Sequence, residues 1–348
     1  MNRSRKSTGL LLGLGILLPL VMILSIGTGP VFIPATDIIS LLLDRLGFID
    51  NTIAEHTRLI VESIRLPRTL LGVLVGSSLA IGGASMQGLF RNPLADPSII
   101  GVASGAALGA AIAIVLGGML LSDFPPLIQH YSVSLLAFIG SIFTTLVVYK
   151  MGTTNNGTSV ATMLLAGVAI TALAGAGLGI LTYISDDATL RNLTFWQMGS
   201  IAGATWNSVL ICLSILAPVT LILCRYGSVL NAMLLGESEA RHLGINVQAV
   251  KLKLILLTAL AVGVSVSMAG IIGFVGLVVP HLIRLMVGPD HKVLLPASAM
   301  LGGILLLVAD MVARVIVSPA ELPIGIVTAL MGAPFFISLL WQQRTRIA

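Results

Sequence analysis

Unbroken apolar runs recur along the chain, each close to the roughly 20 residues that one helix needs to cross a bilayer core of about 30 Å. An outer-membrane barrel would instead show short segments of alternating polarity. Composition agrees, because 56% of the residues are apolar and only 9% are charged, whereas a soluble domain carries about 25% charged residues. We therefore expect an all-α integral membrane protein, and we exclude a soluble enzyme and a disordered chain.

Ten apolar segments are visible, and we interpret them as ten transmembrane helices of a single polytopic domain, residues 1–348. They cover approximately 8–29, 66–90, 98–121, 132–149, 160–183, 205–224, 250–269, 271–288, 293–314 and 323–341. The first is taken as a retained helix rather than a signal peptide, because no small-residue cleavage site follows it. The seventh and eighth segments are barely separated.

Segments two and seven also share five identities at an offset of 187 residues: Val75, Gly76, Ser78, Gly83 and Pro93 match Val262, Gly263, Ser265, Gly270 and Pro280. Glycine-rich helices match by chance, so the signal is weak. If it is real, it predicts an inverted repeat that relates helices 2–5 to helices 7–10, an arrangement that transporters use.

Basic residues predict the orientation of the helices. With the N-terminus inside, thirteen of the nineteen Lys and Arg residues fall on the cytoplasmic side, as the positive-inside rule requires. The other six are Arg45, Arg58, Arg65, Arg68, Arg191 and Arg314. Both termini are thus expected in the cytoplasm. The net charge of +5 is then a topology signal, and no nucleic-acid partner is expected.

Two polar stretches between the helices have a pattern of their own. The outer stretch 30–65 places Ile38, Leu41, Leu42 and Leu46 on one helical face, which predicts a short amphipathic helix lying on the membrane surface. The cytoplasmic stretch 228–248 predicts a short helix that ends at a glycine and mixes charged with small residues. Such a surface favours docking onto another protein, with an ordinary loop helix as the alternative.

Residues that carry chemistry are scarce. Asp310 is the one clear carboxylate inside the segments, and Arg314 follows one turn later, so an i,i+4 ion pair is favoured over a proton or sodium site. The five histidines show no metal-ligand spacing, and no lysine follows a glycine as a Walker A motif requires. We therefore expect no catalytic residue, no metal and no bound cofactor, and any ATP drive would have to come from a partner.

Several motifs resemble bacterial ABC importer permeases for iron chelates, haem and cobalamin, the FecCD type. Phe90-Arg91-Asn92-Pro93-Leu94-Ala95-Asp96-Pro97 resembles the family signature F-x-N-P-L-A-x-P. The stretch from Gly236 to Gly244 is similar to the family's coupling loop. Residues 273–281 (GFVGLVVPH) and 321–325 (ELPIG) are similar to two further family motifs. The resemblance covers about residues 60–340.

The resemblance implies a homodimer in the lipid of the bacterial inner membrane, with two ATPase subunits that bind ATP and Mg²⁺ below it and a periplasmic binding protein above it. It implies a cytoplasmic gate at Asn92, Leu94, Thr158 and Ser159. The ATPase coupling residues would be Gly236, Glu237, Ala240, Arg241, Leu243 and Gly244. Arg65, Arg68 and Arg314 would dock carboxylates of the binding protein, as exposed arginine forks can.

The cargo is predicted from a subfamily resemblance alone. The outer stretch 190–206 (LRNLTFWQMGSIAGATW) is most similar to haem permeases. We therefore expect haem as the transported substrate, with a ferric siderophore or cobalamin as alternatives in the same class. A secondary transporter driven by an ion gradient is the alternative from another class, supported by Asp310 and the possible repeat.

Overall fold

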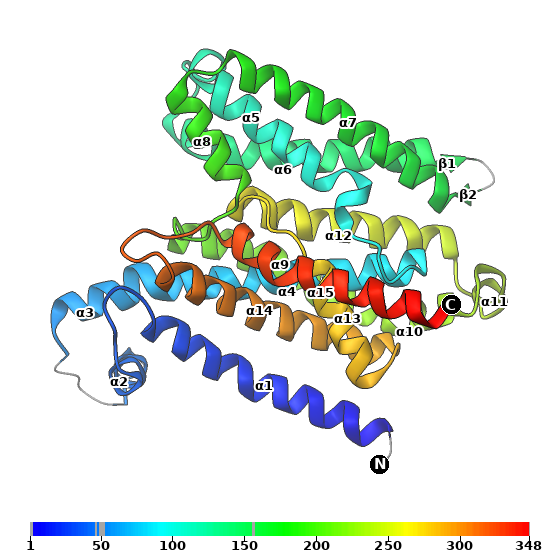
Figure 1. Cartoon of the computed structure of the whole chain (residues 1–348), viewed down its shortest axis with the longest axis horizontal. Coiled ribbons are helices and arrows are strands. Elements are labelled where there is room, and N and C mark those ends of the chain that lie inside the picture. Colours follow the sequence, from blue (N-terminus) through cyan, green and yellow to red (C-terminus); the bar gives the residue numbers. More distant parts are fainter. Residues whose placement is uncertain (1–2, 46, 49–52, 155–156, 348) are drawn as a thin grey trace.

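The computed structural model describes residues 3–45, 47–48, 53–154 and 157–347, which form an elongated bundle of helices (Figure 1). The helices along its long axis match the ten apolar segments. They are α1 (Arg3–Gly27), α4 (Leu66–Phe90), α5 (Val102–Leu120), α6 (Pro126–Gly152), α7 (Val160–Ile184), α9 (Trp206–Arg225), α12 (Val247–Ala269), α13 (Val275–Val287), α14 (His291–Val315) and α15 (Ile324–Ile347).

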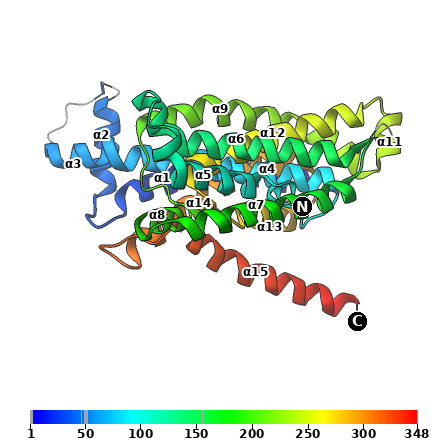
Figure 2. The same ribbon diagram turned by 90° about the horizontal axis from the view of Figure 1, so that it is seen from above.

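Short elements gather at the two ends of the bundle (Figures 1 and 2). One end, here called the α3 end, carries α2 (Ala35–Arg45), α3 (Glu55–Leu59), the π-helix η1 (Ile60–Arg65) and α8 (Asp187–Gln197). The opposite end, the α11 end, carries α10 (Gly227–Leu234), α11 (Glu237–His242), the 3₁₀ helix η2 (Pro97–Ile100), and a hairpin of β1 (Thr153–Thr154) and β2 (Gly157–Thr158). The start of α1 and the end of α15 also lie toward the α11 end (Figure 1).

Among the described residues, eight helices are long and apolar enough to cross a membrane. The two shorter apolar helices are Val275–Val287 and Ile324–Ser338. A non-helical stretch, residues 270–274, separates α12 from α13 and resolves the close spacing of segments seven and eight. Phe274, within this stretch, has a φ of +67°. Just before the stretch, the backbone oxygen of Ala269 accepts a hydrogen bond from Ser200 N at 2.7 Å. An unpaired backbone oxygen at this position would be costly in lipid.

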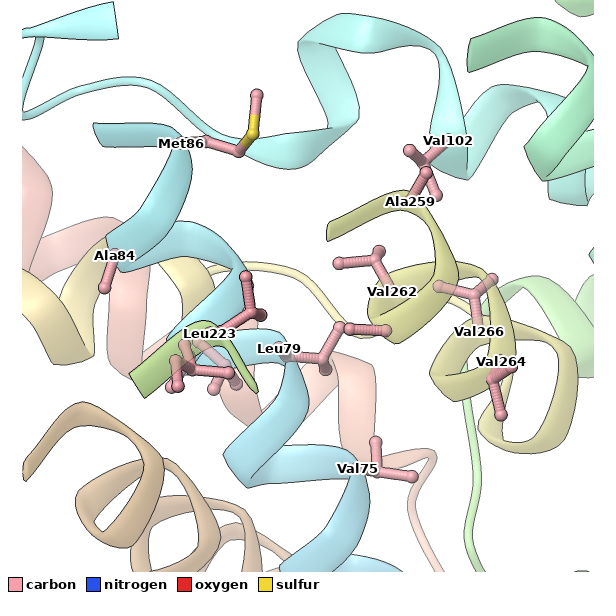
Figure 3. Close-up of a cluster of buried hydrophobic side chains, with 14 of the residues drawn as sticks. Val75, Leu79, Ala84, Met86, Val102, Leu223, Ala259, Val262, Val264 and Val266 are labelled. Carbon is pink, nitrogen blue, oxygen red and sulfur yellow. The ribbon is translucent and has the colours of Figure 1, made fainter. Parts of the chain in front are cut away.

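Helix α4 lies at the centre of the bundle and packs against α14, α12, α9 and α13. Figure 3 shows buried side chains from α4, α9 and α12 meeting in the main apolar cluster. Glycines permit these close contacts: a Cβ on Gly76 would collide with the backbone of Gly302 on α14. Small residues that let helix backbones approach are the expected basis of packing inside lipid.

The predicted helix in stretch 30–65 is present as α2, and its position on the membrane surface stays a prediction. Ile38 and Leu41 are buried in a cluster with Ile26, Ile33 and Val61, so the apolar face packs against the chain itself. Trp206 Nε1, at the start of α9, donates to Glu62 O at 2.9 Å and ties the stretch to the bundle. Leu46, predicted to share that face, lies outside the described residues.

The inverted repeat stays a prediction. Gly83 lies within the unbroken helix α4, whereas its counterpart Gly270 follows the end of α12 at the start of the non-helical stretch. The two segments therefore differ in local structure at a position where their residues match.

Candidate functional site

Helix α11, predicted as the coupling helix, is a single short helix bounded by two glycines at the α11 end. Gly236 has a φ of +122° and Gly244 a φ of +81°, conformations that L side chains rarely adopt. Arg241, Leu243 and Gly244 are exposed, and 64% of the Leu243 surface is accessible. Leu235, at the start of the same stretch, is 69% accessible, so this end of the bundle exposes more than one large apolar side chain.

Ala240 differs from its neighbours because it is fully buried, with 0% of its surface accessible. We expected it on the surface that meets the ATPase, and this is wrong. It packs with the main apolar cluster and anchors α11 to the bundle. Its small size serves the internal packing of the coupling helix.

Glu237 joins α11 to the body of the protein. Its Oε1 lies 2.6 Å from the Nζ of Lys251 on α12. The lysine side chain is 3% exposed, and its Nζ also donates to the backbone oxygen of Thr158 at 3.0 Å. One buried ammonium group therefore connects the coupling helix to a predicted gate residue.

Thr158 and Ser159, the second pair of predicted gate residues, lie at the start of α7. Thr158 is buried, its hydroxyl lies 3.1 Å from that of Thr153 across the hairpin, and its N–H donates to Gln248 Oε1 at 3.1 Å. Ser159 is exposed and caps α7, because its Oγ accepts from Thr162 N at 3.3 Å.

Asn92 and Leu94, the first pair of predicted gate residues, lie in the exposed loop after α4. Arg91 ends the helix with a φ of +50°, and the Asn92 side chain accepts from Leu94 N at 2.9 Å, which folds the loop into a tight turn. Leu94 is 40% exposed. Neighbouring Asp96 lines a cavity of about 290 Å³ together with residues 271–274 of the non-helical stretch.

The three arginines predicted to dock a binding protein are buried, and this expectation of exposed arginine forks is wrong. Arg65, Arg68 and Arg314 have 5%, 7% and 3% of their surface accessible. Arg65 donates to backbone oxygens of Ile26, Gly27 and Val31 at the end of α1 and the turn that follows it. These bonds direct the Arg65 guanidinium toward this chain's own backbone.

The other two arginines share one carboxylate. Asp310, 1% exposed, accepts from Arg68 Nη2 at 2.8 Å and lies 2.9 Å from Arg314 Nη2. Arg68 Nη1 lies 2.9 Å from Glu321, and Arg314 also donates to Ser25 O at 3.0 Å. The predicted Asp310–Arg314 pair is thus confirmed. It belongs to an arginine cluster, Arg65, Arg68, Asp310, Arg314 and Glu321, which ties together α1, α4, α14 and the loop before α15.

Sequence reasoning missed Lys251, Gln248 and Glu321 as parts of these networks. Lys251 carried a signal, since a charged residue near the start of an apolar helix needs a partner or an interface. Glu321 was noted only as the start of the motif 321–325, and Gln248 carried no signal, because a single polar residue near a helix end is ordinary. The described residues contain no group of three or more His, Cys, Asp or Glu that could hold a metal ion.

Comparison with known proteins yields close relatives. The model of the FecCD transport family matches residues 17–342. The hemin transport system permease HmuU of Yersinia pestis is 48% identical over 282 residues, 81% of this chain and 83% of that protein. The cobalamin import system permease BtuC of Halobacterium salinarum is 44% identical over 294 residues, 84% of this chain and 76% of that protein.

A solved structure agrees with this arrangement of helices. It is described as an inward-facing conformation of a metal-chelate type ABC transporter, and it superimposes with a TM-score of 0.83 at 33% identity over 96% of this chain and 99% of that one. The family match spans nearly the whole sequence and the fold match nearly the whole bundle. The chain therefore belongs to the FecCD transport family and is a multi-pass permease subunit of an ABC import system.

Proposed function

We propose that this permease carries haem across the bacterial inner membrane into the cytoplasm, by alternating access driven by ATP hydrolysis on a partner subunit. One observation carries the choice of cargo: the 48% identity to a hemin transport permease over four fifths of both chains. The outer stretch 190–206 supports it through its own resemblance to haem permeases. A ferric siderophore or cobalamin is the alternative, because a cobalamin permease is 44% identical.

The proposed energy source fits the charges inside the bundle. Asp310 could bind a coupling ion only if it were free, and two buried guanidinium groups occupy it. A coupling ion would have to displace two guanidinium groups that already pair with this carboxylate. The exposed Arg241 and Leu243 on α11 instead offer a surface to a protein that could supply force. ATP with Mg²⁺ would bind on that partner.

The proposed assembly is a homodimer with two ATPase subunits at the α11 end and a haem-loaded periplasmic binding protein at the α3 end. Both chain termini are then cytoplasmic. A face of α7 supports the second copy, because Gly175 and Gly179 meet nothing within 4 Å and Val168, two turns before Gly175, is 64% exposed. Backbones that carry small residues can approach closely within lipid. The exposed side chains of α8, such as Arg191, are available to a binding protein.

Uptake in proteoliposomes tests the proposal. Vesicles hold the permease with its ATPase, with ATP inside and haem-loaded binding protein outside. We expect haem to accumulate only when ATP is present, and a protonophore to leave the uptake unchanged. Empty vesicles and vesicles without the ATPase measure passive entry of haem, which is a lipophilic molecule.

The results of this experiment distinguish an error in the transported molecule from an error in the class of transporter. Uptake of cobalamin or a ferric siderophore, but not of haem, would overturn the cargo and keep the ATP-driven mechanism. Uptake without the ATPase, driven by a pH or sodium gradient, would overturn the mechanism itself and favour a secondary transporter.

A further inference from the structure

We propose that Lys251 is the positioning residue that transmits movement of the coupling helix α11 to the gate hairpin β1–β2 and the start of α7. This inference rests on the proposed function, because it assumes that an ATPase moves α11. It assigns to one buried lysine a role that no motif in the sequence marks.

The contacts of Lys251 carry the argument. Its ammonium group is within reach of two acceptors from different parts of the chain, Glu237 Oε1 on α11 at 2.6 Å and Thr158 O on β2 at 3.0 Å. The side chain is 3% exposed, whereas that of Glu237 is 31% exposed. The lysine is therefore enclosed, and the glutamate lies between it and the surface where a partner binds.

Burial makes the connection stiff. A buried ammonium group that loses its partner is left charged in surroundings of low polarity, which is strongly unfavourable. If α11 shifts and takes Glu237 with it, Lys251 must follow or lose its counter-charge. The same Nζ donates to Thr158 O. If Lys251 moves with α11, the hairpin therefore moves as well.

A second side chain of α12 binds the backbone N–H of Thr158. Gln248, one turn before Lys251, accepts from the Thr158 N–H at 3.1 Å. The N–H and C=O of Thr158 are thus both bonded to the first turns of α12. Gly157 has a φ of +114°, and a Cβ there would collide with the Gln248 side chain, so the hairpin is fitted closely to this helix.

Thr158 is connected to α7 through the backbone itself. Ser159 follows Thr158 directly and caps α7. A displacement of Thr158 O therefore changes the position of the cap and of the first turn of α7. The order of connection is α11, Glu237, Lys251, Thr158, Ser159 and α7.

The test compares Lys251→Met with Lys253→Met. Methionine keeps the approximate length of the side chain and removes the charge. Lys253 lies two residues further along α12 and is exposed, so its substitution is a matched control. The readout is the rate at which a thiol reagent modifies Ala161→Cys, an exposed position in the first turn of α7, with and without ATP. The background carries serine in place of Cys212 and Cys224.

We expect the ATPase complex of Lys251→Met to assemble and to hydrolyse ATP, while transport falls by about tenfold or more because the counter-charge is lost. The ATP-dependent change at Ala161→Cys should vanish. Lys253→Met should match the unmodified chain in every readout. Lys251→Arg, which keeps a cation with several donors, should restore part of the response.

Three results would overturn the inference. One is a Lys251→Met complex whose label responds to ATP as the unmodified chain does. Another is a Lys251→Met chain that fails to fold while Glu237→Gln folds and responds normally, since the lysine would then be structural. The third is an unmodified complex whose label ignores ATP. Absence of haem uptake with a normal label response would overturn the proposed cargo and leave the role of Lys251 in place.

Discussion

The two ends of the bundle use charge in opposite ways. At the α3 end the arginine cluster is closed: Arg68, Arg314 and Asp310 are nearly inaccessible, and their partners belong to this chain. At the α11 end the ion pair of Lys251 and Glu237 is half open, because the glutamate is 31% exposed and Arg241 and Leu243 face outward. A closed cluster holds helices at fixed positions, whereas a half-open pair can be reached and moved by a partner.

This difference decides which substitutions should damage the fold and which should damage function alone. Removing one member of a closed cluster leaves buried charge uncompensated. Changing an exposed residue at the α11 end should leave the bundle intact.

Asp310→Asn should have the largest effect. It removes the carboxylate that neutralises both Arg68 and Arg314, and breaking a buried ion pair costs about 3–5 kcal/mol. We expect a lower Tm in detergent and a smaller fraction of monodisperse protein in size-exclusion chromatography. Glu321→Gln is the control, since that side chain is 32% exposed and should matter less. An unchanged Tm for Asp310→Asn would show that the cluster does not hold the helices.

Ala240→Trp and Leu243→Asp should separate packing from docking on α11. The tryptophan enters a fully buried position, and overpacking costs about 1–3 kcal/mol, so the Tm should fall. In Leu243→Asp the aspartate replaces an exposed leucine. The Tm should therefore stay unchanged, while co-purification with the ATPase is lost. A stable Ala240→Trp chain would contradict the buried position of Ala240. Normal ATPase binding by Leu243→Asp would move the docking surface elsewhere.

Ser159→Ala should cost about 1 kcal/mol, the usual contribution of an N-cap. The change removes the oxygen that accepts from Thr162 N at the start of α7. Thermal denaturation measures it, and Ser159→Asp, which can still cap, should stay near the unmodified Tm. Equal Tm values for the alanine and aspartate variants would show that the cap contributes nothing.

The smallest effect should come from Asp290, which caps α14 at the α11 end outside the apolar helices. A hydrogen bond from the Asn231 side chain lowers the pKa of Asp290, with a further contribution from the Lys292 N–H. A carboxyl with a lowered folded-state pKa adds stability above its unfolded pKa and loses it as pH falls through the folded value.

The window for Asp290 is therefore acidic, below about pH 4. We expect the Tm difference between the unmodified chain and Asp290→Asn to be largest near neutral pH and to shrink on acidification. Melting curves over this range measure it. A difference that does not change with pH would show that the charge of Asp290 adds nothing beyond its hydrogen bonds.

Local composition was enough to predict much of this protein. The ten apolar segments reappear as helices, because a helix in lipid must satisfy its own backbone and needs about 20 apolar residues to do so. The family motifs led to the same class of transporter as the whole-chain comparisons. The short helix after residue 236 followed from the glycine at its end and from its mixture of charged and small residues.

Only the tertiary structure showed which residues are exposed and which charged residues are paired. Arg68 and Asp310 are 242 residues apart in the sequence and meet only because α4 packs along α14. An arginine at a helix end looks the same in a sequence whether it faces a partner or a buried carboxylate. Ala240 and Leu243 are three residues apart, and packing against the bundle makes one of them buried and the other exposed.

The sequence by itself thus determined which segments are helical and what class of protein they build, since hydrophobic length and turn residues act locally. The tertiary structure alone decided which charges are closed off and which can be reached. It also decided that Lys251 lies between the coupling helix and the gate. The physical reason is that the cost of burying a charge depends on partners that folding brings from distant parts of the chain.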